Sequence, residues 1–499
     1  MRPVLRPRRT LDEIAALLDV EAPPSHAAEI VTGLSLNTKR VQPGDVFLAL
    51  PGGRAHGIEF ASQAIDAGAV AILTDPAGAG QVDAVPLLVV DEPRAELARL
   101  SAWFYDHPSE AFRTVGITGT QGKTTTTYLA EAALGPRRAG VIGTIGTRIG
   151  RRSVASALTT PEAPELQALF AVMREEDVEA CVMEVSSHAI VQGRADGFRF
   201  DVAVFLNLGR DHLDFHHTLE EYFLAKAALF TPQRARRALV NVDDEHGRAL
   251  VDLIESNLPV STFSTAGRPA DWRAVNIRPS RGETSVDVLM PDGESLAMTV
   301  PLPGAFNVSN ALAALAALTT CGFDPAELAA GIAESPGVPG RMERVDLGQE
   351  FVALVDYAHK PDAVTAVLSA LRPVTAGRLI VVIGAGGDRD QGKRPLMGEA
   401  AAALADLVIV TDDNPRSESA PAIRADVLDG AAAGPAASIE IGDRAEAIAH
   451  AVAIAHRGDT VVVAGKGHET GQEIAGVVHP FDDREVLAAA ITDRLGSSA

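Results

Sequence analysis

A glycine-rich segment at residues 116–127, with the sequence GITGTQGKTTTT, carries the clearest chemistry in the chain. It follows a short β-prone run and precedes a segment of helical composition. Glycines let backbone N–H groups turn toward an anion, and the following helix adds its positive N-terminal end. Lys123 is spaced to reach β/γ-phosphates, and the Thr124 hydroxyl to bind Mg²⁺. The segment predicts a nucleotide-phosphate loop, although Ile117 stands where the strict pattern has its first glycine.

Polar side chains also follow two apolar, strand-like runs of the middle of the chain. Glu184 and His212 end consecutive predicted strands, so both could hold a Mg²⁺ that bridges nucleotide and substrate oxygens. A buried charged pair with a structural role is the alternative. Asp211 and Asp214 are expected to cap a helix rather than bind metal. Lys226 lies among apolar residues of a helix, and its position alone predicts a side chain that extends to solvent.

The last third of the chain has its polar residues in loops after predicted strands. The turn at residues 413–416, DNPR, presents an amide and a guanidinium, and Arg416 suits a bidentate contact with a carboxylate. The segment GKGHE at residues 465–469 lacks a Ser or Thr after its lysine, so it is not expected to be a second nucleotide site. Three cations close together predict an anion-binding loop, with a solvated basic loop as the alternative: Arg389, Lys393 and Arg394.

Composition limits the class of protein. A chain of 499 residues with 46% hydrophobic and 22% charged residues predicts a globular protein of about three domains. A net charge of −22 argues against general nucleic-acid binding, because polyanions are repelled on average. Cys181 and Cys321 are expected to be buried free thiols of a reducing compartment. The chain has no apolar run of about 18 residues and no signal-peptide pattern, so we expect a cytoplasmic protein without a membrane span.

The pattern of strands and helices predicts an α/β protein of three domains. Residues 1–108 form a small α/β domain, residues 109–337 a central doubly wound domain of the P-loop ATPase type, and residues 338–499 a Rossmann-like α/β domain. Near-continuous apolar strands that alternate with helices indicate mostly parallel sheets buried on both faces. Ligands bind such sheets outside the carboxyl ends of the strands, where the polar clusters fall.

Taken in order, these motifs resemble the Mur ligases, the ATP-dependent amino-acid ligases of peptidoglycan precursor synthesis. The likeness covers nearly the whole chain. It rests on the phosphate loop TGTQGKTT at 118–125, on LPGAFNVSN at 302–310 and on GRME at 340–343. Gln121 stands where the family usually has asparagine. The resemblance implies ATP and Mg²⁺ as cofactors and small molecules as substrates.

The resemblance also implies five groups of site residues. The catalytic group is Lys123, Glu184, His212 and Lys226, the last as a carbamylated lysine (N6-carboxylysine). The metal would be held by Thr124, Glu184 and His212. ATP would be bound by Gly119, Thr120, Gln121, Gly122, Lys123, Thr124, Thr125, Asn307, Arg341, Asp356 and His359. The UDP-linked muramoyl dipeptide would be bound by Ser35, Thr159, Thr160, Ser186, Gln192 and Arg194. The incoming amino acid would be bound by Arg389, Asp413, Asn414, Arg416, Gly465 and Glu469.

Within the family, the motifs are most similar to members that add the third residue of the stem peptide to UDP-MurNAc-L-Ala-D-Glu through an acyl phosphate. The form DNPR is the one associated with meso-2,6-diaminopimelate. The distal carboxylate of this amino acid would pair with Arg416, and lysine has no such carboxylate. Ligases that add lysine or another diamino acid, and a non-catalytic nucleotide-binding relative, are the alternatives. The resemblance further implies a monomer. The chain departs from the family at residues 37–39, Asn-Thr-Lys in place of Asp-Ser-Arg, and at Lys360, where threonine is common.

Overall fold

The structure is a computed structural model that describes residues 1–53, 55–150, 152–280 and 282–497. The chain divides into two compact units. The first unit comprises residues 1–208, 216–262 and 316–324, and the second comprises residues 209–215, 263–315 and 325–499. None of the helices in the described part of the chain has both the length and the apolar character to cross a membrane.

The N-terminal part of the first unit contains a four-stranded parallel sheet of order β3-β4-β5-β6. Its strands are β3 (Gly33–Ser35), β4 (Asp45–Leu48), β5 (Ala71–Thr74) and β6 (Leu87–Val89). A two-stranded antiparallel sheet precedes it, formed by β1 (Arg9–Thr10) and β2 (Ile30–Val31). The helical segments are α1 (Leu11–Leu17), η1 (Thr38–Arg40), η2 (Gly57–Phe60), α2 (Ala61–Asp66), α3 (Pro93–Phe104) and η3 (Pro108–Ala111). Thr10 and Glu13 cap α1 reciprocally.

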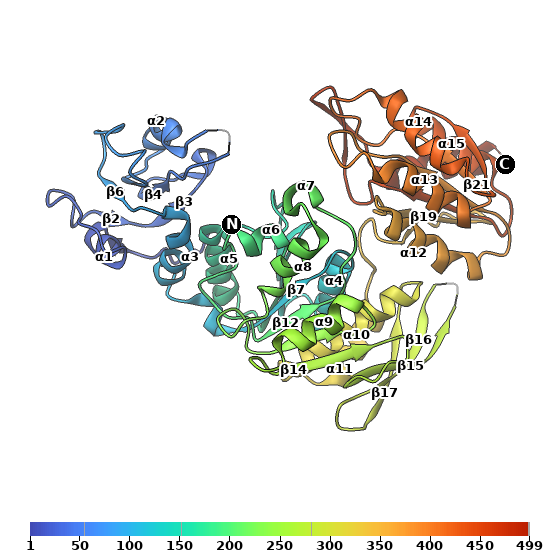
Figure 1. Ribbon diagram of the computed structural model, residues 1–499, viewed down its shortest axis with the longest axis horizontal. Helices are drawn as coiled ribbons and strands as arrows, with labels where there is room; N and C mark the ends of the chain where they lie inside the picture. The colour runs from blue at the N-terminus through green and yellow to red at the C-terminus, as the bar shows by residue number, and fades with distance from the viewer. Residues whose placement is uncertain (54, 151, 281, 498–499) are drawn as a thin grey trace. The chain divides into compact units, whose positions relative to one another are not determined.

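A larger sheet follows in the first unit, with strand order β10-β9-β8-β11-β7-β12-β13-β14. Figure 1 labels three of these strands, β7, β12 and β14. Five neighbouring strands of this sheet, in the order β8-β11-β7-β12-β13, pair in parallel. β9 pairs antiparallel with β8, and β10 pairs antiparallel with β9. The strands are β7 (Arg113–Thr118), β8 (Ala139–Gly143), β9 (Gly146–Ile149), β10 (Arg152–Val154), β11 (Ala180–Glu184), β12 (Val202–Phe205), β13 (Ala238–Asn241) and β14 (Val260–Ser264). The helices are α4 (Lys123–Leu134), α5 (Ala163–Glu175), α6 (Ser187–Val191), α7 (Leu213–His216), α8 (Leu219–Ala227) and α9 (Glu245–Ile254). β14 and α7 contribute residues to both units.

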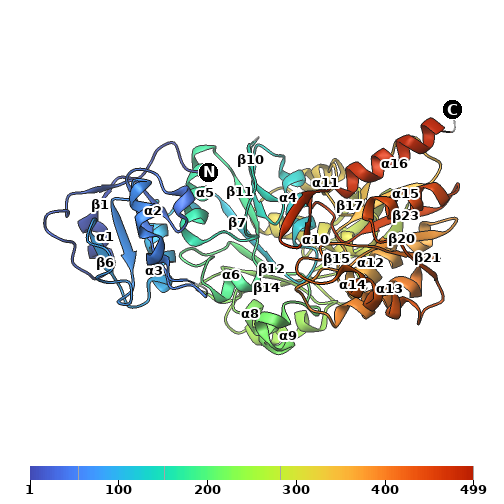
Figure 2. The same ribbon diagram turned by 90° about the horizontal axis from the view of Figure 1, so that it is seen from above.

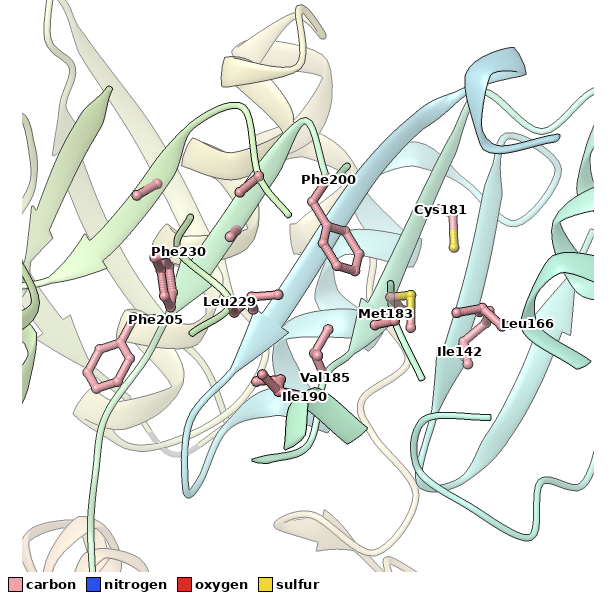
Figure 3. Close-up of a cluster of buried hydrophobic side chains, with 14 of the residues drawn as sticks. Ile142, Leu166, Cys181, Met183, Val185, Ile190, Phe200, Phe205, Leu229 and Phe230 are labelled. Atoms are coloured by element: carbon pink, nitrogen blue, oxygen red, sulfur yellow. The ribbon is translucent and has the colours of Figure 1, made fainter. Parts of the chain in front are cut away.

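Strand β11 shows how this sheet is buried on both faces. Cys181, Met183 and Val185 alternate along the chain and point into one core cluster, which also holds Leu166 of α5 (Figure 3). The residues between them are buried as well, on the face that α4 covers. Burial raises the pKa of the Cys181 thiol. A strand buried on both faces is apolar throughout, which is why the sequence pattern identified it.

The second unit contains an antiparallel hairpin and a second parallel sheet. β15 (Trp272–Pro279), β16 (Thr284–Leu289) and β17 (Ser295–Val300) pair in succession, and the last two residues of β14 pair with β15. Two helices follow, α10 (Ala305–Thr320) and α11 (Pro325–Ala333). The last residues of α10 belong to the first unit. Cys321, just beyond α10, is only partly buried rather than buried as expected, and burial still raises the pKa of its thiol to about 12.

The second parallel sheet has strand order β18-β19-β23-β20-β21-β22, in which only β18 is antiparallel. Its strands are β18 (Glu343–Arg344), β19 (Val352–Asp356), β20 (Leu379–Ile383), β21 (Leu407–Val410), β22 (Ala437–Glu440) and β23 (Thr460–Ala464). The helices are α12 (Pro361–Leu371), η4 (Arg372–Val374), α13 (Lys393–Leu404), α14 (Ala420–Ala431), α15 (Arg444–Ile454) and α16 (Asp483–Ser497). One core joins the sheet to α12, α13 and α14, and another joins its opposite face to α15 and α16 (Figure 2). The predicted doubly wound α/β domain is therefore present.

A short hairpin of β24 (Gly471–Ile474) and β25 (Val477–Pro480) lies between β23 and α16 in the chain. The sequence analysis did not predict it. Its residues are mostly exposed, so its sequence has no apolar alternation to mark it. The hairpin matters for the site, because its first strand bonds to the DNPR turn.

Candidate active site

The predicted phosphate loop is the turn between β7 and α4. Gly122 caps α4 with φ +85°, a left-handed conformation that glycine adopts without strain. The helix starts at Lys123, whose ammonium turns back into the loop and donates to the carbonyls of Gly119 (2.7 Å) and Thr120 (3.3 Å). The loop therefore combines a cation with the N-terminal end of a twelve-residue helix, which is the arrangement that binds phosphate.

The side chain of Asn207, just after β12, holds this loop in shape. Its Oδ1 accepts hydrogen bonds from the backbone N–H of Thr120 (3.1 Å) and of Gln121 (2.9 Å). Its Nδ2 donates to the Gln121 carbonyl at 3.2 Å. One side-chain amide therefore satisfies three backbone groups of the loop.

Glu184, at the carboxyl end of β11, lies against the first turn of α4. Its carboxylate is almost fully buried and accepts from the Thr124 hydroxyl (2.9 Å) and the Thr144 N–H (2.8 Å) at Oε1, and from the Thr144 hydroxyl (3.1 Å) at Oε2. A Cβ on Gly143 would come within 2.3 Å of this carboxylate, so the glycine leaves room for it. A carboxylate and a hydroxyl are hard oxygen donors, and Mg²⁺ needs only one or two carboxylates when phosphates complete its shell. The pair fits Mg²⁺, although no group of three His, Cys, Asp or Glu side chains forms a metal site within the described ranges.

Lys226 on α8 is buried, contrary to the expectation that it extends to solvent. Its Nζ donates to the Gly119 carbonyl at 3.1 Å and lies 4.4 Å from the centre of the Tyr222 ring. The ring face and the carbonyl stabilise the ammonium in place of water. Lys226 thus points at the same carbonyl as Lys123, and the phosphate loop has two lysines beside it.

Five of the six residues predicted to bind the muramoyl dipeptide are linked to one another beside Glu184. The Thr160 hydroxyl donates to the Glu184 carbonyl (2.9 Å) and accepts from the Ser186 N–H (3.1 Å). Arg194 donates to the Thr160 carbonyl (3.3 Å) and to Gln192 Oε1 (2.5 Å). Thr159 belongs to the same group through a 3.0 Å hydroxyl contact with Thr144.

The sixth residue, Ser35, lies in β3 of the other sheet of this unit, where its hydroxyl donates to the Asn37 carbonyl (3.0 Å). His212 falls in the second unit, so the predicted metal pair of Glu184 and His212 divides between the units. There the His212 ring lies 3.1 Å from an oxygen of Asp211.

Asp211 does not cap a helix, which corrects the expectation from the sequence. Its carboxylate accepts a short hydrogen bond from the Lys360 ammonium, and α7 begins only at Leu213. The Lys360 and His212 charges hold the pKa of Asp211 well below its usual range despite burial. The side chain of Asp214 lies outside the described part of the chain. Lys360, the departure from the family pattern, therefore forms an ion pair at the edge of the second unit's sheet.

Four residues predicted to bind ATP lie in the second unit. Asp356, at the end of β19, is buried and accepts from the N–H groups of Met342 (2.7 Å) and Ala358 (2.8 Å), and burial raises its pKa. Arg341 lies 4.1 Å from the centre of the Tyr357 ring. His359 stacks edge-on against the same ring at 4.4 Å. Burial and the neighbouring lysines 360 and 393 hold the pKa of His359 well below its usual value, so its ring is neutral at pH 7. Asn307, in α10, donates to the Pro303 carbonyl at 2.8 Å.

The predicted amino-acid pocket is organised around a lysine that the sequence analysis did not select. Lys466 is fully buried, and its ammonium contacts Asn414 Oδ1 (3.0 Å), Asp413 Oδ1 (3.3 Å) and Glu469 Oε2 (3.5 Å). The Asn414 Nδ2 donates to the same Glu469 oxygen at 3.0 Å. Gly465 sits beside Asp413 with φ +120°, where any Cβ would lie 3.0 Å from that carboxylate. The dismissed GKGHE segment therefore supplies the cation that joins the DNPR turn to Glu469.

The two arginines predicted for this pocket differ. Arg416 is held in place: its Nη1 donates to the Gly387 carbonyl (2.7 Å) and its Nε lies 3.2 Å from Glu473 Oε2. Arg389 is exposed, and within the described ranges it donates only to the carbonyl of Asp388, at 3.4 Å. The structure thus fixes the Arg416 side chain and leaves Arg389 at the surface.

Comparison with known proteins identifies the family. Three family models match the chain: "Mur ligase family, catalytic domain" at residues 30–105, "Mur ligase middle domain" at 117–318 and "Mur ligase, glutamate ligase domain" at 340–467. The UDP-N-acetylmuramoyl-L-alanyl-D-glutamate--2,6-diaminopimelate ligase of Streptomyces coelicolor is 54% identical over 99% of each chain. The ligase of the same name from Corynebacterium glutamicum is 50% identical over 95% of each.

Solved structures agree with this assignment. A ligase of that name has a TM-score of 0.67 at 34% identity, covering 97% of this chain and 99% of its own. MurF from Acinetobacter baumannii, at 19% identity, shares the fold with a TM-score of 0.72 over 98% of this chain and 100% of its own. The chain belongs to the Mur ligase family of ATP-dependent ligases.

Proposed function

We propose that the protein joins meso-2,6-diaminopimelate to UDP-N-acetylmuramoyl-L-alanyl-D-glutamate, with conversion of ATP to ADP and phosphate, in peptidoglycan precursor synthesis. The observation that carries the proposal is the likeness, over the whole chain, to ligases named for this reaction. The pocket of the second unit supports it, because Arg416 offers a guanidinium to a carboxylate and Glu469 offers a carboxylate to an ammonium.

In the proposed reaction the D-Glu γ-carboxylate attacks the γ-phosphorus of ATP, the bond from that phosphorus to ADP breaks, and an acyl phosphate forms. An amine of diaminopimelate then attacks the acyl carbon, loses a proton and displaces phosphate. Such transfers require positioning and neutralisation of charge more than covalent participation of the protein. Lys123 already points at the Gly119 carbonyl of the phosphate loop, where its charge can neutralise the phosphates.

A magnesium ion would be held by Thr124 and Glu184, with His212 as a further proposed ligand from the second unit. When bound, Mg²⁺ would neutralise the charge of the phosphates. The Glu184 carboxylate is kept in position by Thr144, so it does not have to be reoriented when the ion arrives. Carbamylation would turn Lys226 from a cation into an anion that can accompany the metal.

The other residues of the candidate site would bind the three substrates. Thr159, Thr160, Ser186, Gln192 and Arg194 would bind the dipeptide beside Glu184, and Ser35 would bind the UDP end. Asn307, Arg341, Asp356 and His359 would bind the rest of the nucleotide. Diaminopimelate would be bound by Arg389, Asp413, Asn414, Arg416, Gly465 and Glu469. We place domain boundaries near residues 108 and 337 and expect a monomer; because ATP is a cytoplasmic co-substrate, we place the enzyme in the cytoplasm.

The test is phosphate release with ATP, Mg²⁺ and UDP-MurNAc-L-Ala-D-Glu, with meso-diaminopimelate compared with L-lysine. We expect diaminopimelate to be strongly preferred and Arg416→Ala to lower kcat/KM for it by about 10- to 100-fold, the value of a charge-assisted contact. The variant should leave KM for ATP unchanged. A preference for lysine would identify a Mur ligase of other specificity, and no turnover with either amine would overturn the proposal.

A further inference from the structure

Arg416 is held by the β24–β25 hairpin as well as by its own turn. Its backbone has φ +53°, in the left-handed region that arginine rarely adopts. Two backbone hydrogen bonds to β24 fix this conformation: Arg416 N–H donates to the Glu473 carbonyl (3.0 Å), and Ala475 N–H donates to the Arg416 carbonyl (2.7 Å). The Glu473 N–H donates in turn to Asn414 Oδ1 at 2.9 Å. The hairpin therefore sets the position of Arg416 and brings Glu473 beside it.

The guanidinium of Arg416 already has a carboxylate on one edge. Glu473 Oε2 lies 3.2 Å from Nε, and Nη1 is bonded to the Gly387 carbonyl. Nη2 makes no hydrogen bond to any residue in the described part of the chain. The edge formed by Nε and Nη2 is one of the edges on which arginine binds a carboxylate with two parallel hydrogen bonds. A substrate carboxylate on that edge would take the place of Glu473.

Glu473 is free to leave this position. Its side chain is 39% exposed, and it forms no ion pair other than that with Arg416 among the residues that the structure describes. Exposed pairs of this kind are weak, because water and salt screen both charges. By contrast Glu469, on the other side of Asn414, is bonded to Asn414 and to buried Lys466. The pocket thus has one acid fixed within its network and one acid that can rotate away.

We infer that Glu473 is a specificity-determining residue whose carboxylate competes with the distal carboxylate of the amino-acid substrate for Arg416. This inference rests on the proposed function, since it takes diaminopimelate as that substrate. The competition keeps the guanidinium paired in the free enzyme and weakens the binding of the distal carboxylate. It does not act on an amine substrate that lacks a second carboxylate, such as lysine.

The test compares Glu473→Gln with the wild-type enzyme in the same phosphate-release assay. We expect KM for meso-diaminopimelate to fall about two- to five-fold, the value of an exposed ion pair. The kcat and the KM for ATP should stay unchanged, and KM for L-lysine should not fall. Glu473→Ala should act in the same direction, which separates loss of the competing carboxylate from a new contact of the amide. Glu399→Gln is the matched control, because it removes an exposed charge from α13 that has no ion pair in the described structure.

An unchanged or raised KM for diaminopimelate in Glu473→Gln, with the wild type active, would overturn this inference and leave the proposed function standing. An equal fall in KM for lysine would also overturn it, because the effect would not depend on the second carboxylate. A wild-type enzyme that releases no phosphate with diaminopimelate would overturn the proposed function and the inference together.

Discussion

The predicted phosphate loop of the first unit and the proposed amino-acid pocket of the second unit hold their cations in opposite ways. Lys123 and Lys226 donate to a backbone carbonyl, that of Gly119, which carries only a partial charge. Lys466 and Arg416 face the side-chain carboxylates of Asp413, Glu469 and Glu473. Cations paired with a carbonyl keep most of their charge for a polyanion, whereas cations paired with acids form a site of alternating charges. The first arrangement suits phosphate, and the second suits an amino acid that carries ammonium and carboxylate groups together.

The largest effect should come from breaking the charged network of the second unit. Lys466→Met leaves Asp413 buried without its cation and should lower the free energy of unfolding by about 3–5 kcal/mol. Urea unfolding measures this loss, and amide hydrogen exchange should locate it in the second unit. A stability equal to that of the wild type would show that Lys466 does not hold the pocket together.

The matched change in the first unit should affect catalysis instead. Lys123→Ala removes a cation that is bonded to carbonyls, so we expect little change in stability but a loss of at least about 100-fold in kcat, as for other transition-state donors. Phosphate release measures the rate, and thermal unfolding checks the fold. A Lys123→Ala enzyme of normal activity would remove this lysine from the mechanism and end the contrast between the two regions.

A smaller effect, on the free energy of unfolding, should appear in the second unit when the pH is lowered. Burial, with the charges of Arg341 and Arg484, lowers the pKa of His468 to about 4. Above pH 6.5 this histidine is neutral in both the folded and the unfolded chain. As pH falls from 6.5 toward 4, the unfolded chain takes up the proton first, so folded stability declines over that window. Between pH 7 and pH 5 the loss should be about 1–2 kcal/mol. Urea unfolding of wild type and His468→Gln at both pH values measures it, and equal pH dependence of the two would contradict the assignment.

The parts of the molecule that the sequence predicted are those set by local pattern. The phosphate loop was recognisable because its glycines and Lys123 lie within a few residues of one another, and β11 because a doubly buried strand is apolar throughout. The network around Lys466 could not be recognised in the sequence, because Asp413 and Glu469 lie on different loops and no spacing in the sequence joins them. The prediction that Lys226 extends to solvent was wrong for the same reason. The carbonyl that stabilises its buried charge is more than one hundred residues earlier in the chain.

The family resemblance supplied what local pattern could not, namely the grouping of distant residues into sites. It did not supply features peculiar to this chain. Lys360 binds Asp211 where the sequence suggested a helix cap, and Glu473 reaches Arg416 from a hairpin without a sequence signal. Both are ion pairs between segments that only the folded sheet brings together.

The state of the two cysteines has a practical consequence for labelling. Burial raises the pKa of both thiols, to about 12 for Cys321 and further for Cys181, so neither forms an appreciable amount of the thiolate that reacts with maleimides at neutral pH. A cysteine introduced at Val478, which is 67% exposed on β25, would carry a fluorophore by itself. The native sequence is therefore already suited to single-site spectroscopy, with a reporter on the strand that pairs with the one carrying Glu473.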